Sequence, residues 1–387
     1  MDLRYPPEAE AFRLELRSWL EANAEPDLAA PHETLERGSP ALERLVAWNR
    51  KLAEAGYAAM SWPVEYGGRG ASLLEQVVFV EEMERVQAPA TVNLIGMPNI
   101  APAIMQWGTD EQKERFLPRM MRGDDIWCQG MSEPDAGSDL ASLSTRAVLD
   151  GDSFVVDGQK TWNTLGHIAD WCQLYVRTDP SAPKHKGISC LLVDMRTPGV
   201  EVRPLKTITG DLGFSELFFT DVRVPKAALL GPLHEGWKVA TTTLAHERAG
   251  VAKLHLQLRR NIAELISLST RTILPDGRRA SEDPVLRQKL ARIYLEGEYL
   301  KLLSDRAVSG LLHGRATGPE GSLAKLVWSD LQNHIAEVTS DVLGPDGLGG
   351  RPGAQRVSVR AASIAGGTTQ VNRNIIAQRV LGMPRGG

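Results

Sequence analysis

The chain has 387 residues, of which 42% are hydrophobic and 24% are charged, values that are ordinary for a globular protein of two or three domains. Its net charge of −4 provides no basic surface for nucleic acid, and no apolar run is long enough to span a bilayer. Three scattered cysteines argue against a disulfide framework or a structural metal site, and the N-terminus has no apolar signal core, so we expect a cytoplasmic protein.

The first third of the chain, to about Ile126, has the apolar spacing of helices. Stripes of helical period run through Ala11–Leu20, Leu42–Ala55 and Leu74–Val86. Between them, the glycine-rich run Trp62–Gly70 has the composition of a rigid loop. The sequence Thr109-Asp110-Glu111-Gln112 has the form of a capping box and predicts the start of another helix.

From about Trp127 to Pro232 the apolar period changes to two, which is typical of strands. Asp150-Gly151 and Asp157-Gly158 lie between alternating stretches, and we predict a hairpin turn at each. Many short strands separated by turns predict a small barrel or sandwich. The further strand candidates are Trp171–Arg177, Ile188–Asp194, Val200–Leu205 and Glu216–Val224.

After Gly236 the helical period returns and continues to the C-terminus. Long stripes cover Trp237–Thr270, Val285–Leu312 and Leu323–Leu343, and a last helix is expected over Thr369–Leu381. The order is therefore helices, strands, helices. We expect a mainly α protein with a helical domain at 1–126, a middle β-barrel domain at 127–233 and a helical bundle at 234–387.

Glu247 lies on the first of these C-terminal helices and has uncharged neighbours on its own face. Positions three and four residues away carry Thr243, Leu244, Gly250 and Val251. Arg248 is rotated by about 100° and need not neutralise this carboxylate. Because most helical glutamates are solvated, the pattern alone leaves a surface role and a functional role open.

Several common catalytic motifs are absent, among them a dinucleotide-binding glycine turn, a Walker-type loop, a zinc-protease helix and a nucleophile elbow. Three polar stretches remain: Gln129–Leu140, Lys160–Thr164 and Gly366–Gln370. Their glycines and hydroxyls suit a phosphate or the edge of a heteroaromatic ring, although a capped loop explains the first equally well. The third precedes a predicted helix, where anions are favoured.

These stretches and the α–β–α order resemble the acyl-CoA dehydrogenase family over nearly the whole chain. The matching landmarks, in order, are Trp62–Gly70, Gly108–Lys113, Ser132–Asp139, Asp157–Trp162 and Arg373–Gly382. The resemblance implies an N-terminal helical domain, a middle β-barrel, a C-terminal four-helix bundle and FAD as cofactor. It also implies a tetramer in which a neighbouring subunit completes the adenine end of the flavin site, and an electron-transfer flavoprotein or similar acceptor as partner.

The reaction that the resemblance implies is removal of two hydrogens from the α and β carbons of an acyl-CoA thioester, with a carboxylate as base and the flavin as hydride acceptor. By position, Ser138, Arg248, Gly366 and Gly367 are expected to contact the substrate. The residues expected to bind the flavin are Gln129, Met131, Ser132, Gly137, Ser138, Trp162, Asn163, Thr164, Thr368, Thr369 and Gln370.

The chain departs from the family pattern at the usual position of the base. Many members carry a glutamate just before the C-terminal glycine-threonine stretch, but Ser363–Thr368 contains no carboxylate. The isovaleryl-CoA and long-chain acyl-CoA dehydrogenases instead place the base on the first bundle helix, directly before an arginine. Glu247-Arg248 is similar to that arrangement, so we predict Glu247 as the catalytic base.

A second departure concerns the adenine end of the cofactor. The family's Arg-x-Thr-Phe-Gly motif is not found around Arg271–Arg279, and an expected glutamine is replaced by Asp341, which would repel a pyrophosphate. One interpretation is a diverged homotetramer in which Arg278 or Arg279 replaces the motif. The other interpretation is a heterotetramer in which a paralogous partner supplies it, this chain being a half-site or a catalytically silent subunit. A related flavin oxidase is a further alternative for the function as a whole.

Overall fold

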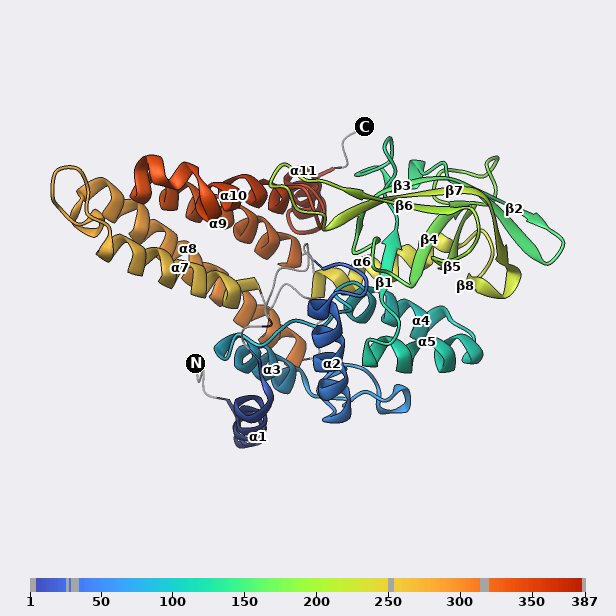
Figure 1. The fold of residues 1–387 in the computed structure, drawn as a ribbon, viewed down its shortest axis with the longest axis horizontal. Coiled ribbons are helices and arrows are strands. Elements are labelled where there is room, and N and C mark those ends of the chain that lie inside the picture. Colours follow the sequence, from blue (N-terminus) through green and yellow to red (C-terminus); the bar gives the residue numbers. More distant parts are fainter. Residues whose placement is uncertain (1–4, 26–27, 29–34, 250–253, 314–319, 385–387) are drawn as a thin grey trace. The chain divides into compact units, whose positions relative to one another are not determined.

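The computed structural model describes residues 5–25, 28, 35–249, 254–313 and 320–384 (Figure 1). It divides into two compact units, Met1–Glu247 and Arg248–Gly387. None of the helices within the described ranges is long and apolar enough to cross a bilayer.

The N-terminal part of the first unit is helical, as predicted. Its α-helices are α1 (Pro7–Asn23), α2 (Pro40–Glu54), α3 (Leu73–Arg85), α4 (Ala101–Trp107) and α5 (Asp110–Arg122). The predicted capping box of α5 is confirmed, because Gln112 N donates to Thr109 Oγ1 at 3.3 Å and Thr109 N donates to Gln112 Oε1 at 3.2 Å.

The helices α1 and α3 are joined by a buried carboxylate. Glu82 of α3 is 2% exposed and accepts hydrogen bonds from Arg13, Arg17 and Arg85. Burial alone would raise the pKa of Glu82, but the three guanidinium groups lower it to about 2. The ionised form of Glu82 therefore stabilises the packing of α1 on α3.

Eight strands form one sheet in the middle of the chain. They are β1 (Trp127–Gly130), β2 (Arg146–Asp150), β3 (Ser153–Thr164), β4 (Trp171–Arg177), β5 (Ile188–Asp194), β6 (Val200–Leu205), β7 (Phe214–Pro225) and β8 (Leu229–Leu230). Their order is β6-β7-β3-β2-β4-β5-β8, with β1 parallel to β4. The helices α4 and α5 share a core with the sheet that includes Ile104, Phe116, Trp127 and Leu192.

One of the two predicted hairpin turns is wrong. Asp150 pairs with Ser153 across the turn at Gly151, which confirms the first hairpin. Around Gly158, however, β3 continues without a break, and its register against β7 shifts there. Gly158 has a φ of 148°, and a Cβ on it would lie 2.6 Å from Thr145 Oγ1, so the glycine permits a bulge rather than a turn.

The remaining α-helices are α6 (Gly236–Ala249), α7 (Leu254–Arg271), α8 (Pro284–Leu312), α9 (Glu320–Leu343), α10 (Gly350–Ser358) and α11 (Thr369–Arg379). Within the second unit α7, α8 and α9 pack against one another, and α11 packs on α9. Their core includes Leu258, Ile262, Leu290, Leu331 and Ile335. The α–β–α order predicted from the sequence is thus confirmed.

Candidate functional site

The segment Gln129–Ser132, which we call the β1 strip, is held by the end of β3. Asn163 Nδ2 donates to Gln129 O at 2.6 Å, and Thr161 N donates to Ser132 O at 2.9 Å. Lys160 Nζ donates to the third carbonyl, Met131 O, at 3.1 Å. The structure therefore brings together two of the polar stretches that the sequence singled out, although they lie about thirty residues apart.

A bulge in β3 turns Trp162 outward beside the β1 strip. The register between β3 and β7 shifts between Lys160 and Asn163, and Trp162 has a φ of 62°. Its side chain is 62% exposed and meets the ring of Phe214 edge-on at 5.8 Å. A large aromatic side chain at positive φ is rare, so the bulge presents a flat apolar surface at a conformational cost.

Several polar groups near Trp162 have no hydrogen-bond partner within the described residues. Asn163 Oδ1 is buried without a hydrogen-bond partner, and within the described part of the chain the hydroxyls of Ser132 and Thr164 have none either. Buried polar atoms normally have partners, so an orphaned one indicates a group that the protein alone does not supply. An exposed indole next to unpaired acceptors and donors fits a heteroaromatic ring such as the isoalloxazine of FAD.

A buried ion pair between Lys160 and Glu133 lies next to the β1 strip and is hydrogen-bonded to it through Met131 O. Lys160 is 0% exposed, and its Nζ donates to Glu133 Oε1 at 2.8 Å. Glu133 also accepts from Ser144 N at 2.6 Å and Thr145 N at 2.9 Å. Burial alone would raise the pKa of Glu133, but Lys160 and these donors lower it to about 2.

Gly137 and Ser138 lie on the exposed loop after this pair. A Cβ on Gly137 would meet no atom within 4 Å, so the fold itself does not require a glycine there. Asp139, next in the chain, is hydrogen-bonded to Lys184. The loop is thus accessible to a ligand at the positions where the sequence predicted flavin and substrate contacts.

The helix α6 carries Glu247 and Arg248 near its end, but their side chains lie outside the described residues. One turn earlier, Thr243 is 0% exposed, and its Oγ1 contacts Gln173 Nε2 at 3.4 Å and Tyr175 OH at 3.2 Å. No sequence pattern predicts these three residues as a group. The available signal was the polar Gln173 within the otherwise apolar run of β4.

In the second unit, the stretch Gly366–Gln370 leads into α11. Gly366 and Gly367 have φ values of 65° and 88°, and the Thr368 hydroxyl caps the helix by accepting from Val371 N at 3.2 Å. The N–H groups of Thr369 and Gln370 in the first turn have no acceptor within the described residues. The first turn of α11 thus has free N–H groups, as the start of an α-helix does, and binding of an anion there stays a prediction.

The segment that leads into α11, Ser363–Thr368, contains no carboxylate. Backbone carbonyls in and next to it accept hydrogen bonds from a lysine and an asparagine side chain. Lys325 Nζ donates to Ala362 O at 2.8 Å and to Gly367 O at 2.9 Å. Asn372 Nδ2 donates to Gly367 O at 2.7 Å. The backbone turn is thus firmly held, but it offers no general base.

Of the two arginines discussed as replacements for the adenine motif, Arg278 already has side-chain partners, and so does Asp341. Arg278 Nε donates to Asp276 Oδ2 at 2.9 Å, and its NH2 group also reaches Asp283 at 3.4 Å. Asp341 is paired with Lys289 at 2.8 Å. The lysine reduces the repulsion that Asp341 would exert on a pyrophosphate, whereas the guanidinium of Arg278 is engaged within its own loop.

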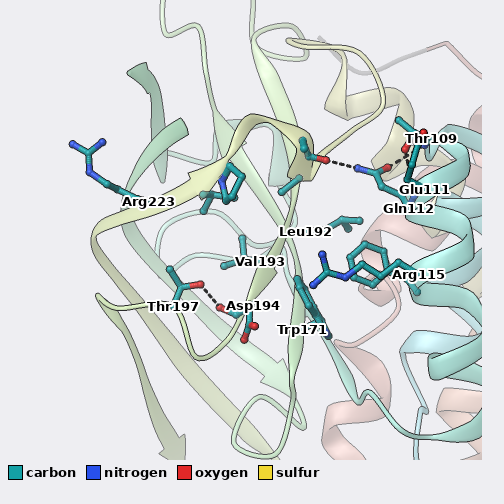
Figure 2. A pocket seen from close by; sticks show the side chains of 15 residues that line it. Thr109, Glu111, Gln112, Arg115, Trp171, Leu192, Val193, Asp194, Thr197 and Arg223 are labelled. Atoms are coloured by element: carbon teal, nitrogen blue, oxygen red, sulfur yellow. Dashed lines mark hydrogen bonds between the residues drawn. The ribbon is translucent and has the colours of Figure 1, made fainter. Parts of the chain in front are cut away.

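A separate cavity of about 660 Å³ lies between α5, β4, β5 and β7 (Figure 2). Its wall includes Trp171, Leu192 and Val193, and the guanidinium of Arg115 lies 4.8 Å from the Trp171 ring centroid. None of the residues predicted to bind flavin or substrate lines it. We therefore do not assign this cavity to the predicted reaction.

Comparison with known proteins agrees with this architecture. Family models of the acyl-CoA dehydrogenase N-terminal, middle and C-terminal domains match residues 6–124, 128–222 and 234–381. Acyl-CoA dehydrogenase IpdE1 of Mycobacterium tuberculosis is 39% identical over 390 residues, which cover 98% of each chain.

Two solved structures are similar over their full length. The Tcur3481-Tcur3483 steroid ACAD has a TM-score of 0.86 and 32% identity, and each chain is covered completely. The ChsE4-ChsE5 complex from Mycobacterium tuberculosis has a TM-score of 0.84 and 34% identity, again with complete coverage of both chains. The chain therefore belongs to the acyl-CoA dehydrogenase family of oxidoreductases.

Proposed function

We propose that the protein is an FAD-dependent dehydrogenase that converts an acyl-CoA thioester to the trans-2-enoyl-CoA, with Glu247 as the base that removes the α proton. The observation that carries the proposal is the place of Glu247 in the sequence and on α6. Ser363–Thr368 contains none, whereas Glu247 follows the buried Thr243 by one helical turn on α6. Arg248 is proposed to lie at the substrate, as the Glu-Arg order in related enzymes implies.

The flavin supplies the acceptor for the β hydride when it is bound. Gln129, Met131 and Ser132 of the β1 strip, with Trp162, Asn163 and Thr164 of β3, are proposed to hold its ring. The support is the exposed indole of Trp162 and the unpaired Asn163 Oδ1. Further contacts are proposed for Gly137, Ser138, Thr368, Thr369 and Gln370 with the cofactor, and for Ser138, Gly366 and Gly367 with the substrate.

For the acyl group, we propose a bulky chain of the steroid class. The support is likeness to the Tcur3481-Tcur3483 steroid ACAD, together with Gly250, a residue without a side chain three positions after Glu247 in the sequence. A panel of butyryl-, isobutyryl-, octanoyl- and steroid side-chain acyl-CoAs tests this proposal. Fastest anaerobic bleaching of the flavin by a straight-chain member would contradict it.

Glu247→Gln tests the base. The variant removes a proton acceptor but keeps the shape of the side chain, so we expect a yellow protein whose flavin absorbance no longer bleaches with acyl-CoA. Loss of one general base typically lowers the rate by about 10²–10⁴-fold. Bleaching at the wild-type rate would exclude Glu247 as the base.

A second candidate function is that of one subunit in a heteromeric dehydrogenase. Engagement of Arg278 by Asp276 favours it, because one of the two arginines that could replace the adenine motif is then held within its own loop. Likeness to the ChsE4-ChsE5 complex gives further support. The FAD content of the chain purified alone separates the candidates: a complete homotetramer binds one FAD per chain, whereas a half-site subunit needs its partner to retain the flavin.

A related flavin oxidase is tested in the same preparation. Rapid reoxidation of the reduced flavin by air would favour an oxidase, whereas an electron-transfer flavoprotein should be the better acceptor for a dehydrogenase.

A further inference from the structure

Gln173 is a fully buried polar side chain in an apolar strand. It is 0% exposed and lies in β4 between Cys172 and Leu174, which are also 0% exposed. A buried amide destabilises the fold unless its oxygen and nitrogen are both hydrogen-bonded. The oxygen of Gln173 accepts from Gln129 Nε2 at 3.1 Å, and its nitrogen donates to Thr243 Oγ1 at 3.4 Å. The side chain thus links the β1 strip to α6.

Thr243 connects these hydrogen bonds to α6. Its hydroxyl donates to Val239 O at 3.2 Å within α6. A hydroxyl has one hydrogen to donate and two lone pairs, so the oxygen accepts from Gln173 Nε2 and from Tyr175 OH. Tyr175 is 1% exposed. Loss of the Thr243 hydroxyl would therefore leave the buried Gln173 Nε2 without this acceptor and would remove one of the hydrogen bonds of Tyr175 OH, which also contacts Cys190.

This series of hydrogen bonds connects the proposed flavin-binding strip with the helix that carries the proposed base. At one end, Gln129 belongs to the strip proposed to hold the flavin, and its carbonyl is fixed by Asn163. At the other end, Thr243 precedes Glu247 by four residues, which is about one turn of the helix. A base and a hydride acceptor must keep a fixed relation to the same substrate, because misplacement by ~1 Å can lower the rate by about 10²-fold.

We propose that Thr243, Gln173 and Tyr175 are positioning residues that fix the turn of α6 carrying Glu247 relative to the flavin-binding strip. The proposal rests on the proposed function of Glu247. It assigns no direct contact between these three residues and the substrate. It predicts instead that the helix turn moves when the hydroxyl is removed.

Thr243→Val is the test variant, because it replaces a hydroxyl by a methyl group of similar size. We expect the rate of flavin bleaching at saturating acyl-CoA to fall by about tenfold or more, with the dissociation constant of the acyl-CoA unchanged. Amide hydrogen exchange in the second half of α6 should become faster by about tenfold. Thr243→Ser restores the hydroxyl and should return both quantities to wild-type values.

The matched control is Thr241→Val on the same helix. Thr241 is exposed, and its hydroxyl donates to Lys238 O within the helix. The change in intrinsic helix propensity is the same as at Thr243, but no strand residue loses a partner. Tyr175→Phe is a second variant that keeps the buried ring and removes one bond, so it should give a smaller effect in the same direction.

The outcomes separate the two proposals. Wild-type bleaching and exchange in Thr243→Val, or equal effects of Thr241→Val, would overturn the positioning role. If Thr243→Val fails to fold, wild-type behaviour of Tyr175→Phe overturns it instead. Normal bleaching of Glu247→Gln refutes the base itself, whereas loss of bleaching there with an unaffected Thr243→Val refutes the positioning role alone.

Discussion

Replacement of Glu133 by glutamine tests how strongly the buried ion pair holds the β1 strip. The two oxygens of Glu133 accept from four donors: Lys160 Nζ, Thr145 N, Ser144 N and Ser144 Oγ. A glutamine has one oxygen, so its NH2 group would face donors that it cannot bond. Lys160, which is 0% exposed, would also lose its counter-charge.

The size of the effect follows from the pKa of Glu133. It is about 2 in the folded protein, compared with 4.5 for an unperturbed glutamate. At 1.36 kcal/mol for each pKa unit, this difference corresponds to at most about 3 kcal/mol of stability at neutral pH from the Glu133 side of the pair, and burial, which lowers the pKa of Lys160, offsets part of it. Removal of one partner from a buried pair costs about 3–5 kcal/mol in other proteins, which agrees.

Native-state hydrogen exchange measures this effect where it is expected. A loss of about 3 kcal/mol should lower the protection of β3 amides by about 100-fold. The control Glu201→Gln removes an exposed carboxylate paired with Arg203 and should leave protection unchanged. In the double variant Glu133→Gln/Lys160→Met the unpaired charge is gone as well, so much of the protection should return.

Two results would refute this reasoning. Unchanged protection in Glu133→Gln would show that the pair contributes little to the stability of β3. A double variant as poorly protected as the single one would show that the loss comes from altered shape and not from the unpaired charge of Lys160.

The remaining predictions concern acid stability, the flavin surface, a close backbone approach and a second carboxylate. Because the pKa of Glu133 is lower in the folded protein than in the unfolded one, its contribution to the free energy of unfolding is complete above about pH 5 and is lost as pH falls toward 2. Urea unfolding should therefore show a free energy of unfolding that falls with pH over this range in the wild type and falls less in Glu133→Gln. Trp162→Ala should weaken FAD binding by roughly tenfold in a fluorescence titration, and unaltered affinity would count against the proposed ring contact. A Cβ on Gly68 would lie 2.2 Å from Trp62 O, so Gly68→Ala should destabilise the protein by about 2 kcal/mol while Gly137→Ala leaves the melting temperature unchanged. Glu82→Gln removes the carboxylate that three arginines bind, so the urea midpoint should fall by an amount equivalent to about 2 kcal/mol of unfolding free energy. An unchanged midpoint would contradict a stabilising role of Glu82.

Local features were predictable from the sequence because short-range chemistry determines them. Predicted stripes at Leu42–Ala55 and Leu74–Val86 correspond to α2 (Pro40–Glu54) and α3 (Leu73–Arg85). The capping box at Thr109 and the hairpin at Gly151 depend on residues within three positions of each other. The error at Asp157-Gly158 has a physical reason: a glycine suits a bulge as well as a turn, and only the pairing of β3 with β7 decides between them.

The geometry of the candidate site could not be predicted in the same way. The sequence singled out Trp162 as an aromatic among hydroxyls, but its positive φ depends on the register of β3 against β7. The contact between Gln173 and Thr243 joins residues separated by 70 positions. Neither follows from periodicity, because both depend on which strands and helices pack together.

The network at Thr243 also bears on the two roles that the sequence left open for Glu247. A solvated helix face predicts exposed hydroxyls along it, as found for Thr241. Thr243 is one turn before Glu247 on the same face, yet it is 0% exposed and bonded to Gln173 of the sheet. The face that carries Thr243 is therefore packed against protein. Glu247→Gln tests whether the carboxylate one turn later on α6 acts as the base.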